Sequence, residues 1–254
     1  MKQKWSFPNS FIMMYALVTG GSRGIGKAIS IKLGEDGYYV LINYVSNKVE
    51  AQKTLEIIKN NGGDGELMQF DVSDPEQIHK VLEEWNEKDK DRYIEVLVNN
   101  AGLAKDNLMV FMSDNEWREV IDTNQNSFFY VTSMVLLNML VKKNGRIVNI
   151  VSLSGQKGQA GQVNYAASKG AVIAATKSLA MEVGKKKVTV NAVAPGFITT
   201  DMTKDLDENQ LKKLVPLNRF GKPEEVAEVV SFLVSEKASY ITGEIISVNG
   251  GLYS

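Results

Sequence analysis

The stretch Tyr15-Ala16-Leu17-Val18-Thr19-Gly20-Gly21-Ser22-Arg23-Gly24-Ile25-Gly26 decides the fold. Its first five residues form an apolar run that is typical of a strand buried on both faces of a parallel sheet. The run ends at glycines, and a pattern typical of a helix follows over residues 25–35. Glycines let the backbone turn tightly and approach a pyrophosphate at a helix N-terminus. The stretch therefore predicts a dinucleotide-binding turn, although its spacing is Gly-x-x-x-Gly-x-Gly rather than Gly-x-Gly-x-x-Gly. A simple packing turn is the alternative.

The alternation of strands and helices continues to the C-terminus. Further strands are predicted over residues 38–43, 67–72, 94–98, 146–151, 188–193 and 244–248, and helices over 48–60, from 75, and over 114–142, 163–183 and 223–235. This alternation predicts an α/β protein, a single-domain Rossmann-like doubly wound parallel sheet of about seven strands with helices on both faces. We expect this domain to span residues 14–254. Residues 1–13 show no strand or helix period, so we expect a loose N-terminal extension, or a natural start near Met14.

Composition excludes several classes of function. The chain has 254 residues and a net charge of −1, which favours neither a nucleic-acid-binding protein nor a membrane-surface protein. The sequence has no cysteine, which excludes disulfides, thiolate zinc sites and a cysteine nucleophile and suits the cytoplasm. The one histidine, His79, lies in an amphipathic helical pattern and is expected at the surface, so no metal site is expected. Proton chemistry then falls to tyrosine, lysine, serine or carboxylates.

Tyr165 and Lys169 are the candidates for that chemistry. They lie one helical turn apart in Asn164-Tyr165-Ala166-Ala167-Ser168-Lys169 and so share one face. A phenol normally keeps its proton until about pH 10, and a nearby ammonium lowers its pKa. The spacing predicts a general acid/base that works near neutral pH. An aromatic side chain that packs beside a solvated lysine is the alternative.

Ligands of open α/β sheets bind beyond the carboxyl ends of the strands. The second strand ends at Asn43 without the acidic residue that would bind the ribose hydroxyls of NAD. Arg23, in the glycine loop, is placed to pair with a 2′-phosphate, so NADP is favoured over NAD. Asp71 is a candidate acceptor for the adenine amino group, with a turn or capping role as the alternative. The expected cofactor contacts are Gly20, Gly21, Ser22, Arg23, Gly24, Ile25, Gly26, Asn43, Asp71, Val72, Asn100, Ala101, Gly102, Tyr165, Lys169, Pro195, Gly196, Ile198 and Thr200.

Ser152 follows the fifth predicted strand and would face the same cleft. Its hydroxyl would hydrogen-bond a substrate carbonyl and favour charge that develops on the oxygen. A helix or turn cap is the alternative. The expected substrate contacts are Ser152, Gln162 and Tyr165.

Together these residues resemble the short-chain dehydrogenase/reductase family. The glycine loop, Asn99 to Gly102, Ser152, and Tyr165 with Lys169 fall in the family's order and spacing. Asn124 matches the fourth catalytic position of the family. The resemblance implies hydride transfer from a nicotinamide to a ketone carbon, with Tyr165 as proton donor and Ser152 orienting the carbonyl. It also implies that Lys169 lowers the phenol pKa and holds the ribose, and that Asn124 holds a water that resupplies the proton.

Stretches outside these motifs are similar to the 3-oxoacyl-[acyl-carrier-protein] reductases within the family. They include residues 105–109, 193–202, 219–227 and 240–251. This similarity implies NADPH as cofactor, a thioester of acyl carrier protein as substrate, a cytoplasmic location and a homotetramer. Because the carrier protein of this group is acidic, Lys143 and Lys186, at the ends of two long helices, are candidate docking residues. Stabilisation of the helix dipoles is the alternative role for these lysines.

Three other functions remain open from the sequence. The same residues would serve a reductase or dehydrogenase of another small ketone or alcohol, and the loop between Thr199 and Phe220 does not reveal which. A dedicated reductase of polyketide or polyene assembly is the second alternative. A non-catalytic dinucleotide-binding subunit is the third, and the presence of all four catalytic residues disfavours it.

Overall fold

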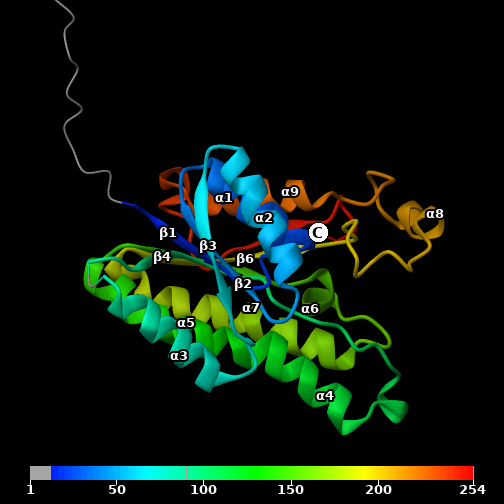
Figure 1. Cartoon of the computed structure of the whole chain (residues 1–254). Coiled ribbons are helices and arrows are strands. Elements are labelled where there is room, and N and C mark those ends of the chain that lie inside the picture. Colours follow the sequence, from blue (N-terminus) through cyan, green and yellow to red (C-terminus); the bar gives the residue numbers. More distant parts are fainter. Residues whose placement is uncertain (1–12, 90, 254) are drawn as a thin grey trace, which may run out of the picture.

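The computed structural model describes residues 13–89 and 91–253, and it shows one sheet between two layers of helices (Figure 1). Seven strands, all parallel, lie in the order β3-β2-β1-β4-β5-β6-β7. The predicted doubly wound α/β fold is therefore confirmed. The expected N-terminal extension lies outside the described residues except for Met13.

The strands are β1 (Tyr15–Val18), β2 (Tyr39–Tyr44), β3 (Asp64–Gln69), β4 (Ile94–Asn99), β5 (Gly145–Ile150), β6 (Val188–Pro195) and β7 (Ile245–Val248). The α-helices are α1 (Gly24–Glu35), α2 (Lys48–Asn60), α3 (Pro75–Glu87), α4 (Asp114–Ile121), α5 (Ser127–Lys142), α6 (Leu153–Lys157), α7 (Val163–Val183), α8 (Glu208–Leu211) and α9 (Pro223–Val234). A π-helical turn, η2 (Asp122–Asn126), joins α4 to α5. None of the helices in the described part of the chain is long and apolar enough to cross a membrane.

Successive residues of each strand face opposite helix layers, as the pleat requires. In β1, Ala16 and Val18 pack in the cluster that contains α1, α2 and α9, whereas Leu17 packs in the cluster that contains α3, α5 and α7. Figure 1 shows these two sets of helices on opposite faces of the sheet. Both faces of the central strands are thus covered, which explains why their sequences are apolar without alternation.

The third strand and the long predicted helix differ from expectation. The strand spans Asp64–Gln69 rather than residues 67–72, in register with β2 from Asp64 beside Tyr39 to Gln69 beside Tyr44. It lies at the sheet edge and starts with polar residues, so its first half lacks the apolar signal of a buried strand. The helix predicted over residues 114–142 is interrupted by the π-helical turn η2.

A buried chain of amides and hydroxyls links the central strands to α7. The Asn99 Nδ2 donates to Asn149 Oδ1 at 2.9 Å and to Thr132 Oγ1 at 3.1 Å. The Asn149 Nδ2 donates to Thr176 Oγ1 at 2.9 Å, and Asn149 is fully buried. Because buried polar groups must be paired, this chain specifies how α5 and α7 sit against β4 and β5.

Replacing Asn149 by alanine tests this chain of hydrogen bonds. We expect Asn149→Ala to lower the free energy of unfolding by about 2–3 kcal/mol, because it leaves the buried Thr176 and the half-buried Asn99 without this partner. The control, Gln52→Ala on the exposed face of α2, should change it by less than about 0.5 kcal/mol. Urea denaturation followed by circular dichroism measures both. Equal effects of the two substitutions would contradict the role given to Asn149.

Candidate active site

The glycine turn after β1 has the backbone that the sequence predicts. Gly20 and Gly24 have φ angles of +60° and +54°, in the left-handed region that favours glycine. A Cβ on Gly26 would lie 2.2 Å from the Gly20 carbonyl oxygen, so only glycine fits where α1 leaves the turn. The first turn of α1 has no acidic residue and no side-chain cap. Its N–H groups therefore fit an anionic diphosphate, which the positive end of the helix dipole favours.

Hydrogen bonds between the residues that follow β1 and β4 hold the glycine turn in place. The Asn100 Nδ2 donates to the Thr19 carbonyl oxygen at 2.9 Å and to that of Gly20 at 3.2 Å. The Thr19 hydroxyl accepts from the backbone N–H groups of Asn100 and Ala101 at 2.9 and 3.0 Å. These bonds fix the ends of β1 and β4 against each other.

The side chain of Asn43, a predicted cofactor contact, is buried beneath the glycine turn. The side chain is only 1% exposed, and its Oδ1 accepts from the Gly20 N–H at 3.0 Å. Its Nδ2 donates to the Phe70 carbonyl oxygen at 2.9 Å. Strand β2 continues one residue further, to Tyr44, so Asn43 lies inside the sheet. Asn43 thus supports the glycine turn from within the sheet.

The predicted cofactor contacts after β3 and β4 differ in how far they are exposed. Asp71 is half-buried, and its Oδ1 accepts from the Ser73 N–H at 2.8 Å and the Ser73 hydroxyl at 2.7 Å, which is the turn role weighed as its alternative. Val72 is 3% exposed and packs in the core. Gly102 is exposed, and a Cβ there would lie 3.2 Å from Asn124 Oδ1 and 3.3 Å from Lys169 Nζ. A side chain at residue 102 would therefore crowd two of the predicted catalytic residues.

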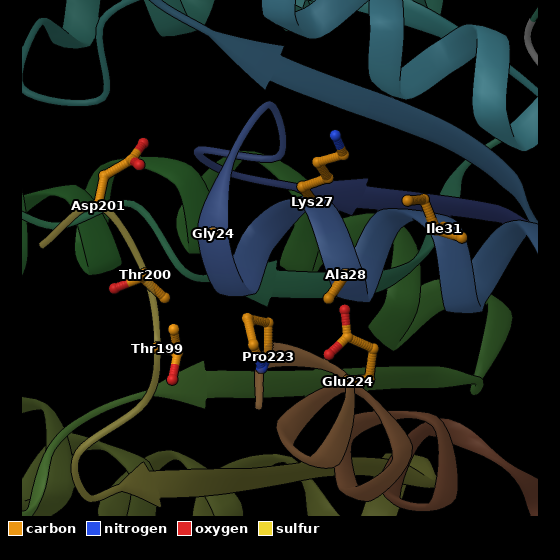
Figure 2. Close-up of a pocket in the computed structure, with 9 residues that line it drawn as sticks. All are labelled: Gly24, Lys27, Ala28, Ile31, Thr199, Thr200, Asp201, Pro223 and Glu224. Carbon is orange, nitrogen blue, oxygen red and sulfur yellow. The ribbon is translucent and has the colours of Figure 1, made fainter. Parts of the chain in front are cut away.

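The loop after β6 borders the glycine turn. Gly196 approaches β7 so closely that a Cβ would lie 2.8 Å from the Cβ of Asn249, and Ile198 is 3% exposed. Figure 2 shows Thr199 and Thr200 beside the first turn of α1, with Pro223 and Glu224 of α9 completing an open pocket of about 520 Å³. Gly24 and Thr200 line this pocket, whereas Ser152, Tyr165 and Lys169 do not. The pocket thus marks only the part of the predicted site beside the helix N-terminus.

Tyr165 lies in the first turn of α7, next to Ser152 at the end of β5. Its ring is partly exposed. Burial of the hydroxyl raises the phenol pKa, interaction with the Ser152 hydroxyl lowers it, and the negative charge of Asp106 raises it. Ser152 also accepts from the Ser154 N–H at 3.1 Å, so the capping role and the site role coexist. The site-facing phenol is therefore held in its protonated, proton-donating form.

Lys169 lies behind the phenol as an almost fully buried ammonium. Its Nζ donates to the Ile150 carbonyl oxygen at 2.9 Å and lies 5.8 Å from the centre of the Tyr165 ring. Burial lowers the pKa of Lys169 to about 8. The lowering of the Tyr165 pKa by Lys169 stays a prediction. In the free protein the net shift of the phenol pKa is upward, chiefly because the phenol is buried.

Asn124 lies in the π-helical turn and points into the protein, 4% exposed. Its Oδ1 accepts from the Leu103 N–H at 2.8 Å, and its Nδ2 donates to the Leu103 carbonyl oxygen at 2.9 Å. The Nδ2 also donates to Ser168 Oγ at 3.2 Å. The π-helical turn widens the helix locally, as such turns often do at functional sites, and brings Asn124 against the loop after β4.

Gln162 precedes α7 and connects two loops of the site. Its Oε1 accepts from the Ser154 hydroxyl at 2.8 Å, and its Nε2 donates to Asp106 Oδ2 at 2.7 Å. Asp106 and Ser154 were not predicted from the sequence. Their only signal is position, since Asp106 lies seven residues after the end of β4 and Ser154 four residues after the end of β5.

The comparisons with known proteins agree with this arrangement. A family model described as enoyl-(acyl carrier protein) reductase matches residues 20–253. The chain belongs to the short-chain dehydrogenase/reductase family. As a member of the short-chain dehydrogenase/reductase family, it is an oxidoreductase that uses a nicotinamide dinucleotide.

Curated relatives within the short-chain dehydrogenase/reductase family cover nearly the whole chain. The chain is 47% identical to the 3-oxoacyl-[acyl-carrier-protein] reductase FabG of Pseudomonas aeruginosa, over 94% of this chain and 96% of the relative. It is 46% identical to the FabG of Vibrio cholerae, with the same shares. It is 44% identical to the FabG of Staphylococcus epidermidis, over 94% of this chain and 98% of the relative.

The candidate docking lysines and His79 lie away from this site. Lys143 follows α5 and lies just before β5, and Lys186 follows α7 and lies just before β6. Both lysines are therefore at the amino ends of the strands, whereas Tyr165 is at the carboxyl ends. The structure therefore does not place these candidate docking lysines beside the cleft of their own chain. His79 lies on α3 with a 54% exposed side chain, 4.0 Å from Glu83, which confirms its expected surface position.

The buried ammonium of Lys169 predicts a change of stability with pH. Its folded pKa of about 8 lies below the ordinary value of 10.5, so between these values the unfolded chain binds the extra proton. Stability should therefore rise with pH through this window. From pH 7 to 9.5, we expect the unfolding free energy of wild type to increase by about 2 kcal/mol relative to that of Lys169→Met. Denaturant titrations at each pH measure it, and parallel curves would refute the burial argument.

Proposed function

We propose that this enzyme reduces 3-oxoacyl-[acyl-carrier-protein] to the 3-hydroxyacyl form, with NADPH as reductant, in fatty acid biosynthesis. The observation that carries the proposal is the placement of Ser152 and Tyr165 side by side, with Lys169 behind them, at the same sheet edge as the glycine turn. The printed function of relatives that are 44–47% identical over 94% of the chain supports the choice of substrate.

In this proposal the bound cofactor supplies a hydride to the ketone carbon. Tyr165 carries its proton at neutral pH and donates it to the carbonyl oxygen. Ser152 donates a hydrogen bond to the same oxygen and stabilises its developing charge. Lys169 has three N–H donors and uses one on Ile150, so two remain for ribose hydroxyls. Asn124 holds a water that resupplies the proton after each turnover.

The preference for NADP rests on charge around the glycine turn. Arg23 is exposed, with an extended backbone directly before α1. The residues from Tyr44 to Val49, which follow Asn43, include no carboxylate that would bind ribose hydroxyls or repel a phosphate. A guanidinium pairs with a 2′-phosphate through charge-assisted hydrogen bonds.

The homotetramer and the cytoplasmic location are further parts of the proposal. Large apolar side chains are exposed on α5 and α7, namely Phe129, Leu137, Val141, Val163 and Met181. Such a patch is typical of a protein–protein interface. An interface between copies of the chain that uses these helices is consistent with the family resemblance.

Turnover of acetoacetyl-carrier protein by wild type and Tyr165→Phe tests the proposed function. We expect wild type to oxidise NADPH with this thioester, and Tyr165→Phe to lose about 10²–10⁴-fold in kcat, because the proton donor is removed. NADPH binding, followed by fluorescence, should change little. The control, Tyr240→Phe, removes a hydroxyl from a fully exposed ring and should retain full activity.

Other substrates separate the alternatives in the same assay. Crotonyl-carrier protein tests enoyl reduction, and small free ketones test a general carbonyl reductase. Preferential turnover of either, with little turnover of the acetoacetyl thioester, would contradict the proposed substrate. Binding of NADPH without turnover of any of them would indicate a non-catalytic subunit.

Replacing Arg23 tests the proposed NADP preference. We expect Arg23→Ala to raise KM for NADPH by about 10–100-fold and leave KM for NADH nearly unchanged, because only the 2′-phosphate loses its partner. Lys59→Ala, which removes an exposed cation on α2, is the matched control. An equal effect of Arg23→Ala on both cofactors would show that Arg23 does not read the phosphate.

A further inference from the structure

Three successive residues of the loop after β4 bind the start of α7. The bonds run from Asn164 Nδ2 to the Lys105 carbonyl oxygen at 3.0 Å, from Gln162 Nε2 to Asp106 Oδ2 at 2.7 Å, and from the Asn107 N–H to the Gly161 carbonyl oxygen at 2.8 Å. Asn164 also accepts from the Tyr165 N–H at 2.7 Å. This loop therefore determines where the first turn of α7, and with it Tyr165, lies.

Asp106 differs from the other two residues of this loop because it binds the start of α7 through its side chain rather than its backbone. A carboxylate only accepts hydrogen bonds, so the Gln162 amide must turn its NH₂ group toward Asp106. The amide oxygen then faces Ser154, whose hydroxyl donates to it at 2.8 Å. The Ser154 N–H donates to Ser152 Oγ at 3.1 Å. A hydroxyl that accepts a bond from one side keeps its own proton free for the other side, which for Ser152 is the cleft.

Asp106 also acts on the phenol through its charge. Charged groups near the Tyr165 ring in the described part of the chain are Asp106 and Lys169. The negative charge of Asp106 disfavours the phenolate and raises the phenol pKa. Asp106 thus contacts the residue that leads to Ser152 and also contributes to the pKa of Tyr165.

We propose that Asp106 is a positioning residue, which orients the Gln162 amide and through Ser154 holds the Ser152 hydroxyl as a hydrogen-bond donor to the substrate carbonyl. The inference rests on the proposed function. It assigns Gln162 a relay role in addition to its predicted substrate contact, since one N–H of its NH₂ group remains for a ligand.

A double-mutant cycle tests the relay. We expect Asp106→Ala and Gln162→Ala each to lower kcat by about 10-fold, and the double variant to lose no more than either one, because they act in series. KM for NADPH should stay unchanged in all three. Glu84→Ala, which removes an exposed carboxylate on α3, is the control. Multiplied losses in the double variant, or a kcat of Asp106→Ala equal to that of the control, would overturn the proposal.

The conservative variant separates geometry from charge. An asparagine at residue 106 still accepts from Gln162 but carries no charge, so Asp106→Asn should keep kcat within about 3-fold at neutral pH. Its Tyr165 should deprotonate at lower pH than in wild type. Absorbance titration of the free protein, with Tyr165→Phe subtracted, measures this without any substrate. If kcat of Asp106→Asn falls as far as that of Asp106→Ala, or the phenol titration does not move, the proposal is wrong.

Absence of turnover in wild type would instead reject the proposed function. The phenol titration would still test whether Asp106 acts on Tyr165. The two failures are therefore distinguishable.

Discussion

The buried ammonium of Lys169 is the constraint around which the rest of the site is arranged. Its only hydrogen-bond partner in the described part of the chain is the carbonyl oxygen of Ile150, the last residue of β5, so helix α7 and the central sheet meet at one charged group. Burial of a cation is unfavourable, and the depressed pKa of Lys169 is the measure of that cost. Gly102 lacks a side chain where one would crowd the ammonium. A fold that keeps such a group, with two donors still unused, is arranged for a ligand with hydroxyl groups rather than for stability alone.

Burial has opposite effects on the pKa values of Lys169 and of the Tyr165 phenol beside it. It lowers the pKa of the ammonium and raises that of the phenol, because it favours the neutral form of each group. A proton donor for ketone reduction must be protonated before the reaction, and burial together with the charge of Asp106 favours that form. If Lys169 bound the phenol directly, the phenolate would be stabilised and the phenol pKa would be lower. The Lys169 ammonium lies 5.8 Å from the ring centre and donates instead to the Ile150 carbonyl oxygen. In the free protein the phenol therefore carries the proton that reduction of a ketone would consume.

The sequence predicted those parts of the molecule that depend on local pattern. The strand–glycine turn–helix unit and the Tyr165–Lys169 spacing are local, and the structure has both where expected. The burial of Asn43 could not be predicted, because it depends on hydrogen bonds to backbone of the glycine turn and of the residue after β3, which are distant in sequence. The π-helical turn was not expected, because a helical pattern over residues 114–142 does not by itself show where i→i+5 hydrogen bonds replace the α-helical ones. Asp106 and Ser154 act through contacts between separate loops, for which a single sequence gives no signal.

The direction of the helices limits where a carrier protein can approach. In this fold each helix returns antiparallel to the strands, so the end of α7 lies at the opposite edge of the sheet from its start. With 21 residues and a rise of about 1.5 Å per residue, α7 separates Lys186 from Tyr165 by roughly 30 Å. A carrier bound at that lysine would have to deliver its thioester across the length of the helix layer. A carrier that approaches the carboxyl edge of the sheet meets the loops that hold Asp106, Ser152 and Gln162 first. The positive charges that matter for docking to the same chain should therefore lie on that edge, among the segments that border the cleft.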